Sequence, residues 1–312
     1  MDNPIKISIV VPVFNSESSI DLLVDRITDS LREIEYELIL VNDKSKDKSW
    51  DKIVAYSASN DRIKGVSLKK NFGQDNAIMA GLIHSTGEFV VIMDDDLQHS
   101  PEDILKLYGY CKSGEGFDVC YGFFKTKNQS LWKNWGSKLN GYLAKVLLKK
   151  PKGLYISPFK IIHASIVREI IHYKGPFPYV DGIIFSLTSN ITQIEIMHHR
   201  RYAGKSNFSM TKSLSVFVRH LTGYSLYPLR IATFIGLWAA TLSFLLGGYF
   251  LFDYLTNDHH VEGWITLVLL IIFFNGLMLM CIGIIGEYIG RVYLTSTTKP
   301  QYVVDKLTWK KK

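Results

Sequence analysis

Short apolar runs rich in β-branched residues alternate with segments of helical spacing through about the first 125 residues of the chain. The apolar runs predict strands at Ile7–Val13, Tyr36–Val41, Ile63–Leu68, Phe89–Met93 and Asp118–Tyr121, with a later strand at Ile191–His198. Apolar residues three or four positions apart predict helices at Ser16–Leu31, Asp75–His84 and Pro101–Lys112. Because strands and helices alternate, we expect an α/β domain with a mainly parallel sheet covered on both faces.

The last third of the chain has a different pattern, with two long runs that contain no charged residue. Ile231–Phe252 has 22 residues and Trp264–Gly286 has 23. Each run is long enough to cross ~30 Å of hydrocarbon as a helix. A buried core helix is the alternative for one such run, but two in succession favour a pair of transmembrane helices.

Charges on either side of these runs predict their orientation. The linker Asp253–Gly263 carries three acidic residues and no Lys or Arg, whereas Arg230, Arg291 and the lysine-rich end of the chain flank the pair. Positively charged flanks stay preferentially in the cytoplasm. We therefore expect the linker to lie outside, and the α/β domain and both termini to lie in the cytoplasm.

A basic segment at residues 125–152 combines apolar residues three or four positions apart with interleaved lysines. This pattern predicts an amphipathic helix that lies in the headgroup layer of a membrane. An ordinary surface helix packed on the sheet is the alternative. Residues 211–230 are a second candidate for a segment of this kind, and they lead into the first uncharged run.

Composition narrows the class of protein further. The 312 residues carry a net charge of +7 and are 47% hydrophobic, which suits one medium domain plus a membrane region. No G-x-G-x-x-G follows the first strand, which disfavours a dinucleotide site, and no P-loop pattern G-x-x-x-x-G-K-[ST] occurs. The spacing of the three cysteines is not that of a metal site. We also expect no nucleic-acid partner.

The acidic stretch Asp94-Asp95-Asp96-Leu97-Gln98 follows directly on the fourth predicted strand. Three carboxylates at the end of a buried strand repel one another unless a cation neutralises them. A hard divalent ion with oxygen ligands, itself bound to a diphosphate, fits this position. The alternative is a helix N-terminus, which explains Ser100–Asp103 well but leaves the three preceding acids unexplained.

The ends of the first two strands supply a second candidate site. Pro12, Val13, Phe14 and Asn15 end the first strand, and Asp43 follows the second. Two neighbouring strand ends form a shelf on which a nucleotide base and ribose can hydrogen-bond to the backbone and to Asp43. Each strand end alone is a weak signal, because strand ends usually carry polar turn residues.

Together these motifs resemble those of GT-A-type family 2 glycosyltransferases, and more narrowly those of the bacterial polyisoprenyl-phosphate glycosyltransferases. The matching segments are Val10-Val11-Pro12-Val13-Phe14-Asn15, Val41-Asn42-Asp43-Lys44-Ser45, Asn71-Phe72-Gly73 with Ala77, Asp94-Asp95-Asp96-Leu97-Gln98, and Gly286-Glu287-Tyr288-Ile289-Gly290-Arg291-Val292-Tyr293 with Lys299-Pro300. The resemblance covers the chain nearly from end to end and implies a GT-A fold, a Rossmann-like catalytic domain with a mainly parallel sheet.

The resemblance also implies roles for the acidic residues. Asp94, Asp96 and Gln98 match positions that bind Mg²⁺ or Mn²⁺ and, through the ion, the diphosphate of the donor; Asp94 also belongs to the nucleotide site. Asp43 would hold the nucleotide base. The nucleophile would be a lipid phosphate, which is largely dianionic at neutral pH because its second pKa is about 6. A single in-line displacement would invert the anomeric centre.

Cations to bind that lipid phosphate are expected late in the chain. Arg201 matches the arginine of a family segment that continues through Ser206, and Arg200 lies beside it. Lys160, and Lys125 or Lys127, replace arginines that relatives often carry. Arginine forks suit phosphate. A solvated basic strand end that faces anionic lipid is the alternative for the two arginines.

Asp181 carries a separate hypothesis. In inverting GT-A enzymes that act on hydroxyl groups, a carboxylate in this part of the chain serves as general base. Asp181 would be that base or a partner of the donor sugar's hydroxyls, and a helix N-cap is the alternative. The sequence leaves these readings open.

The resulting interpretation is a metal-dependent, inverting transferase that moves a sugar from a nucleotide sugar, UDP-linked, to undecaprenyl phosphate in the inner membrane. The product would serve modification of cell-envelope glycans such as lipopolysaccharide O-antigen, and a homo-oligomer such as a tetramer is expected. The expected layout is a catalytic domain at 1–210, the juxtamembrane segment at 211–230, transmembrane helices at 231–252 and 264–286 joined by an external loop at 253–263, and a cytoplasmic tail at 287–312. Alternatives are a same-fold enzyme with a hydroxyl acceptor, with Asp181 as base, and a non-enzymatic scaffold or flippase partner.

Overall fold

The computed structural model describes residues 5–112, 116–124, 151, 153–175, 177–196, 227–256, 263–296 and 300–309. The chain divides into two compact units, which are described separately. The first comprises Met1–Phe208 together with Lys299–Lys312, and the second is Ser209–Thr298. Of the predicted interfacial helix at 125–152, only Pro151 is among the described residues. Residues 211–226 of the predicted juxtamembrane segment lie outside them.

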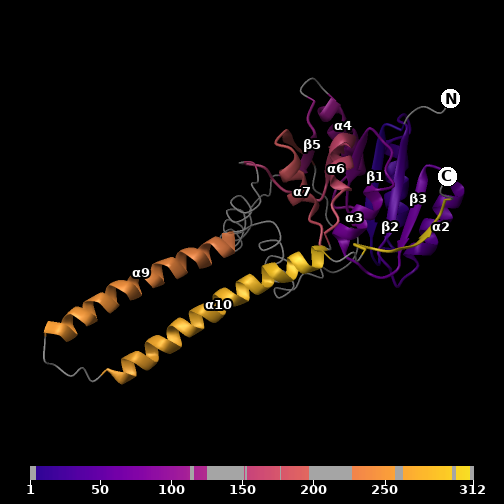
Figure 1. Cartoon of the computed structure of the whole chain (residues 1–312). Coiled ribbons are helices and arrows are strands. Elements are labelled where there is room, and N and C mark those ends of the chain that lie inside the picture. Colours follow the sequence, from indigo (N-terminus) through magenta and orange to yellow (C-terminus); the bar gives the residue numbers. More distant parts are fainter. Residues whose placement is uncertain are drawn as a thin grey trace. The chain divides into compact units, whose positions relative to one another are not determined.

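An eight-stranded sheet organises the first unit (Figure 1). Its strands are β1 (Ile7–Val13), β2 (Tyr36–Asn42), β3 (Ile63–Leu68), β4 (Phe89–Ile92), β5 (Val119–Phe123), β6 (Lys160–His163), β7 (Ile191–Glu195) and β8 (Val304–Leu307). They are ordered β7-β5-β6-β4-β1-β2-β3-β8. The pairs β1–β2, β2–β3, β1–β4 and β5–β7 are parallel, and β6 and β8 run antiparallel to their neighbours. The predicted α/β class with a mainly parallel sheet is confirmed.

Helices cover both faces of this sheet, as the continuous burial of β1 and β2 requires. The helices are α1 (Ile20–Ser30), α2 (Ser49–Ser59), α3 (Gln74–Leu82), the 3₁₀ turn η1 (Pro101–Asp103) with α4 (Ile104–Lys112), α6 (Ala164–Ile170) and α7 (Val180–Leu187). α1, α2 and α4 pack on one face against side chains such as Ile9 and Leu40. α3 packs on the other face, where Gly81 meets Val10 and Val41.

Two strands and three helices of this unit were not predicted. α2 has a weak apolar stripe, with Ile53 as its one fully buried large side chain. β6 and β8 have four residues each, and β6 begins with a buried lysine. α6 and α7 have seven and eight residues, too short for a clear helical period. Such short elements are stabilised by their partners in the fold rather than by their own pattern.

The second unit contains two long helices, α9 (Tyr227–Thr256) and α10 (Trp264–Ser296). Their most apolar stretches are Leu229–Tyr249 and Leu270–Ser296, with mean hydropathy of 1.7 and 2.1. Both helices are long and apolar enough to cross a membrane, and their described side chains are almost entirely exposed. They contain the two predicted uncharged runs, and each extends beyond its run by a turn or more.

Candidate active site at the carboxyl edge of the sheet

The carboxyl ends of β1, β2 and β4 meet at one edge of the sheet. β1 pairs with both neighbours, with Val13 opposite Asn42 and Val10 opposite Ile92. Each of the three strands is followed by a non-glycine residue in the left-handed region: Asn15 (φ 55°), Lys44 (φ 58°) and Leu97 (φ 59°). Left-handed non-glycine residues are uncommon and collect at functional sites. The predicted nucleotide and metal segments therefore lie next to one another at this edge.

The turns after β1 and β2 are joined by reciprocal hydrogen bonds. The Asn15 amide donates to Ser45 Oγ at 3.0 Å, and the Lys46 amide donates to Asn15 Oδ1 at 2.8 Å. Asn42, which is buried, accepts from the Ser45 amide at 3.0 Å and donates to Ser67 Oγ at 3.1 Å. These bonds fix the shelf on which the predicted nucleotide site rests.

Asp43 lies buried on this shelf, and both of its carboxylate oxygens accept backbone hydrogen bonds. Phe72 N donates to Oδ1 at 2.7 Å, and Gly73 N donates to Oδ2 at 2.8 Å. Burial raises the pKa of Asp43, and these two amides oppose the rise. Asp43 thus holds the 72–73 turn in place. Its predicted contact with a nucleotide base stays a prediction.

The three acids after β4 are held by different partners. Asp94 Oδ1 accepts from Gln74 Nε2 at 2.7 Å, and Asp96 Oδ1 accepts from the Gln98 amide at 3.1 Å. Asp95 accepts from the Ser16 hydroxyl and, at 3.3 Å, from the Phe14 amide. Burial raises the pKa of Asp95, and the neighbouring Asp96 charge adds to the rise against the opposing Ser16 and Phe14 bonds. Asp95 therefore binds this loop to the turn after β1, a role that the sequence did not suggest.

The donor chemistry at this edge fits a hard divalent ion. Asp94, Asp96 and Gln98 offer only oxygen ligands in a locally negative place, which suits Mg²⁺ or Mn²⁺. Across the described ranges, no group of three or more His, Cys, Asp and Glu side chains is placed to hold a metal ion. Two acids and an amide would leave coordination positions for the oxygens of a diphosphate, as Mg²⁺ commonly uses substrate phosphates.

A second charged cluster lies within the fold, between β5, β6 and α7. Lys160 Nζ donates to Asp181 Oδ1, and Tyr121 Oη donates to the same oxygen at 2.7 Å. The Lys160 ammonium also lies 5.2 Å from the centre of the Tyr121 ring. Lys160 therefore has an acidic partner inside the protein, and its predicted contact with a lipid phosphate stays a prediction.

Asp181 is the second residue of α7, and Tyr179 occupies the N-cap position of this helix. This placement removes the N-cap reading of Asp181. Asp75, near the start of α3, belongs to the same electrostatic cluster. Burial raises the pKa of Asp75 to about 6 and the Asp181 charge adds to the rise, while Lys160 and the Val180 amide oppose it.

Several residues of the site were missed from the sequence, namely Ser16, Gln74, Asp75, Tyr121 and Tyr179. Gln74 and Asp75 directly follow the Asn71-Phe72-Gly73 segment, so the motif itself was a usable signal. Nothing in the local sequence marks Tyr121. Lys125, Lys127, Arg200, Arg201 and Ser206, predicted for the acceptor site, lie outside the described residues.

Comparison with known proteins extends this geometry. The family model described as "Glycosyl transferase family 2" matches residues 8–171. A bactoprenol glucosyl transferase of Shigella phage SfV is 31% identical over 304 residues, which cover 96% of this chain and 98% of that protein. An undecaprenyl-phosphate 4-deoxy-4-formamido-L-arabinose transferase of Pectobacterium carotovorum is 31% identical over 313 residues, with coverage of 98% and 94%.

Among solved structures, glucosyl-3-phosphoglycerate synthase from Mycobacterium tuberculosis, in complex with Mn²⁺, UDP and phosphoglyceric acid, superposes with a TM-score of 0.53. The two proteins are 18% identical, and the match covers 70% of this chain and 76% of the other. A likeness at this identity supports the fold, and the GT-A expectation is confirmed. By its sequence and its fold, this chain is a glycosyltransferase that belongs to glycosyl transferase family 2.

Proposed function

We propose that this glycosyltransferase transfers a sugar from a nucleotide sugar, UDP-linked, to undecaprenyl phosphate. The observation that carries the proposal is similarity of about 30% over nearly the whole chain, membrane helices included, to proteins named as bactoprenol and undecaprenyl-phosphate transferases. The helices α9 and α10 fit an acceptor that resides in a membrane. The solved fold relative that holds UDP and Mn²⁺ supports a nucleotide donor and a divalent ion.

The donor half of the reaction is assigned to the carboxyl edge of the sheet. The backbone at Pro12–Asn15 and the turn that Asp43 stabilises would hold the nucleoside. Asp94, Asp96 and Gln98 would hold Mg²⁺ or Mn²⁺, which stabilises the negative charge of the leaving diphosphate when it is bound. Gln74 orients Asp94, and Asp95 fixes the loop that carries all three ligands.

The bond changes are those of one displacement at the anomeric carbon. An oxygen of the lipid phosphate attacks that carbon, the bond from the carbon to the diphosphate oxygen breaks, and the nucleoside diphosphate leaves with the electron pair. The phosphate monoester becomes a diester, and the anomeric configuration inverts. Since a phosphate dianion is already a nucleophile, the step needs cations for binding more than a base. The proposed phosphate-binding set remains Arg200, Arg201, Ser206, Lys125 and Lys127, with Lys160, which pairs with Asp181, as a further predicted member.

The contacts of Asp181 favour this acceptor over a hydroxyl group. A general base must have an oxygen available within hydrogen-bonding reach of the acceptor proton. One oxygen of Asp181 already accepts from both Lys160 and Tyr121, and only 12% of its side chain is exposed. We assign Asp181 a positioning role for Lys160 and Tyr121. A hydroxyl acceptor with Asp181 as base is the second candidate.

The proposed location is the inner membrane, with the catalytic unit in the cytoplasm. The flanks of the helical pair are basic and the connection between α9 and α10 is acidic, which favours this orientation. We also propose a homo-oligomer, a tetramer among the possible sizes, because small residues such as Gly247 and Gly276 let helices pack closely. Crosslinking in membranes followed by mass measurement tests the assembly.

The function is tested with the purified full chain in lipid nanodiscs. The protein is incubated with undecaprenyl phosphate, Mn²⁺ and a panel of nucleotide sugars, and the lipid products are identified by mass. A lipid-linked phosphosugar that forms with one donor and disappears in Asp96→Asn supports the proposal. Transfer to a hydroxyl acceptor alone would favour the second candidate. No transfer with any donor or acceptor would overturn both.

A further inference from the structure

The chain returns to the catalytic unit after α10 and adds β8 to the free edge of β3. The pairing is antiparallel, with Val66 opposite Leu307 and Ser67 opposite Lys306. Backbone hydrogen bonds continue beyond the strand, since Lys69 N donates to the Val303 carbonyl at 2.8 Å. An unpaired strand edge would otherwise be exposed there.

Hydrogen bonds of Thr308, the residue that directly follows β8, hold the carboxyl end of this strand in place. The Thr308 amide donates to the Gly65 carbonyl at 3.0 Å, and Gly65 N donates to Thr308 Oγ1 at 2.8 Å. Ser57 of α2 donates to the same hydroxyl at 2.6 Å. A Cβ atom on Gly65 would come within 2.8 Å of Thr308 Cγ2 and 2.5 Å of Ile53 Cγ2, so glycine allows the close approach.

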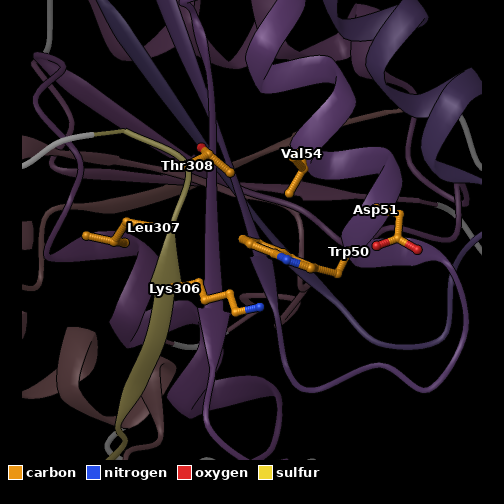
Figure 2. Close-up of a pocket in the computed structure, with 6 residues that line it drawn as sticks. All are labelled: Trp50, Asp51, Val54, Lys306, Leu307 and Thr308. Atoms are coloured by element: carbon orange, nitrogen blue, oxygen red, sulfur yellow. The ribbon is translucent and has the colours of Figure 1, made fainter.

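Next to this fastening, an open groove of about 680 Å³ lies between α2 and β8 (Figure 2). The indole of Trp50 points from α2 toward β8, and Val54, Lys306, Leu307 and Thr308 complete the wall with Asp51. None of the predicted site residues in the described part of the chain lines this groove. The groove lies where β8 packs beside α2. The contacts with the predicted nucleotide site lie at the other end of β8.

At that end, Asp305 contacts two loops of the predicted nucleotide site. Its Oδ1 accepts from Lys69 Nζ at 2.6 Å, and its Oδ2 lies 3.7 Å from Lys44 Nζ. Lys44 directly follows Asp43 and has a left-handed backbone conformation, with φ 58°. Lys69 directly follows β3 and begins the segment that leads to Phe72 and Gly73, whose backbone amides donate to Asp43.

We propose that β8 is a positioning element of the nucleotide site, in which Asp305 restrains the Lys44 turn and the Lys69 segment so that Asp43 and its turn stay ordered. Asp305 acts through other residues and has no proposed contact with substrate. The Lys69 hydrogen bond and the Lys44 charge lower the pKa of Asp305, so it stays ionised at neutral pH. The part that concerns a nucleotide depends on the proposed function; the part that concerns loop order does not.

Two measurements on the full chain test the two parts separately. Hydrogen exchange without ligand reports loop order at residues 43–48 and 69–73, and calorimetry with UDP and Mn²⁺ reports the site. In Asp305→Asn, both peptides should exchange several-fold faster, and the dissociation constant of UDP should rise about three- to tenfold, the scale of two exposed ion pairs. Asp305→Glu should restore most of both effects.

Single lysine variants separate the two arms. Lys44→Met should speed exchange mainly at 43–48, and Lys69→Met mainly at 69–73. Asp29→Asn, which removes an exposed Asp29–Arg32 pair at the end of α1, is the matched control and should change neither readout. Unchanged exchange across the core strands in all variants excludes global unfolding as the cause.

Each outcome decides one claim. Unchanged exchange in Asp305→Asn would overturn the restraint by β8, whatever the enzyme does. Faster exchange with unchanged UDP affinity would overturn the link between the tail and the nucleotide. Failure of the unaltered protein to bind UDP or any other nucleoside diphosphate would overturn the proposed donor, while the exchange data would still test the restraint.

Discussion

Lys160 of β6 and Asp181 of α7 form an ion pair inside the catalytic unit, with 4% and 12% of their side chains exposed. A buried charge is costly unless an opposite charge lies beside it. Replacing one partner should therefore lower the free energy of unfolding far more than replacing both. Tyr121 shares the same carboxylate oxygen and extends the cluster to β5.

Removing one member of this pair should therefore be costly. We expect Lys160→Met to lower the free energy of unfolding by about 3 to 5 kcal/mol, because Asp181 is left as a buried, unpaired charge. Lys160→Met combined with Asp181→Asn should cost less than the sum of the two single changes. Chemical denaturation of the detergent-solubilised protein measures this, and additive costs would mean that the two side chains do not interact.

The acidic loop after β4 should control both activity and metal dependence. Asp94→Asn and Asp96→Asn should each lower turnover by on the order of 100-fold, because each removes a carboxylate proposed to hold the divalent ion that stabilises the leaving diphosphate. EDTA should inactivate the unaltered enzyme, and Mn²⁺ or Mg²⁺ should restore it. Asp29→Asn serves as a surface control, and full turnover in the Asp96 variant would rule out the assigned ligand set.

Asp43→Asn tests the turn at the nucleotide edge. The amide group of asparagine can accept only one of the two hydrogen bonds, so either the Phe72 or the Gly73 amide loses its partner. We expect the free energy of unfolding to fall by about 1 to 3 kcal/mol. Affinity for UDP should weaken as well, and calorimetry measures it; a variant of normal stability and affinity would contradict both roles.

Asp75 should make the stability of the fold depend on pH. Burial raises its pKa from 3.8 to about 6 in the folded state, so folding becomes less favourable as the pH rises through this range and the group must ionise. Asp75→Asn removes that cost. We expect the variant to be more stable by about 1 to 3 kcal/mol at pH 7.5 and equal to the unaltered protein near pH 4.

Thermal unfolding of both proteins across that pH range measures the difference. A gap that stays constant with pH would show that the asparagine acts by other contacts than the titration of Asp75. A variant that is less stable at pH 7.5 would mean that the carboxylate is stabilised in the folded protein, contrary to its burial beside Asp181.

Two helix glycines offer a matched test of packing. A Cβ atom on Gly81 of α3 would collide with Val10 of β1 and come within 3.1 Å of Val41 Cγ2, whereas nothing lies within 4 Å of such an atom on Gly109 of α4. We expect Gly81→Ala to destabilise the protein by about 1 to 3 kcal/mol. Gly109→Ala should stabilise it by up to about 1 kcal/mol, and chemical denaturation compares the two.

Elements with a strong local pattern could be predicted from the sequence. β1 and β3 have the predicted bounds. β1 is rich in β-branched residues and buried along its whole length, and every residue of β3 except Lys64 is buried. β6 was missed because its first residue, Lys160, looks like a surface residue until Asp181 is known to lie beside it. β8 was missed for a similar reason, since four residues become a strand only against β3.

The candidate site likewise contains residues that could be proposed from the sequence and residues that only the structure reveals. Asp43, Asp94 and Asp96 could be proposed from the sequence because strand ends and acid spacing are visible in it, and their roles stay predictions. Their partners Phe72, Gly73 and Gln74 lie where α3 begins, and only the fold brings these residues to them. The sequence therefore predicts which carboxylates lie at the carboxyl edge of the sheet, and the structure adds the hydrogen-bond partners that hold them in place.

The return of the chain to the sheet through β8 also limits what this protein can do for its product. Both ends of the α9–α10 hairpin are anchored in one folded unit, so a bilayer crossed by the hairpin is crossed an even number of times. Under the proposed function, the newly glycosylated lipid starts out in the leaflet nearest the catalytic unit. The sugar of this lipid then lies on the same side of the bilayer as its nucleotide donor.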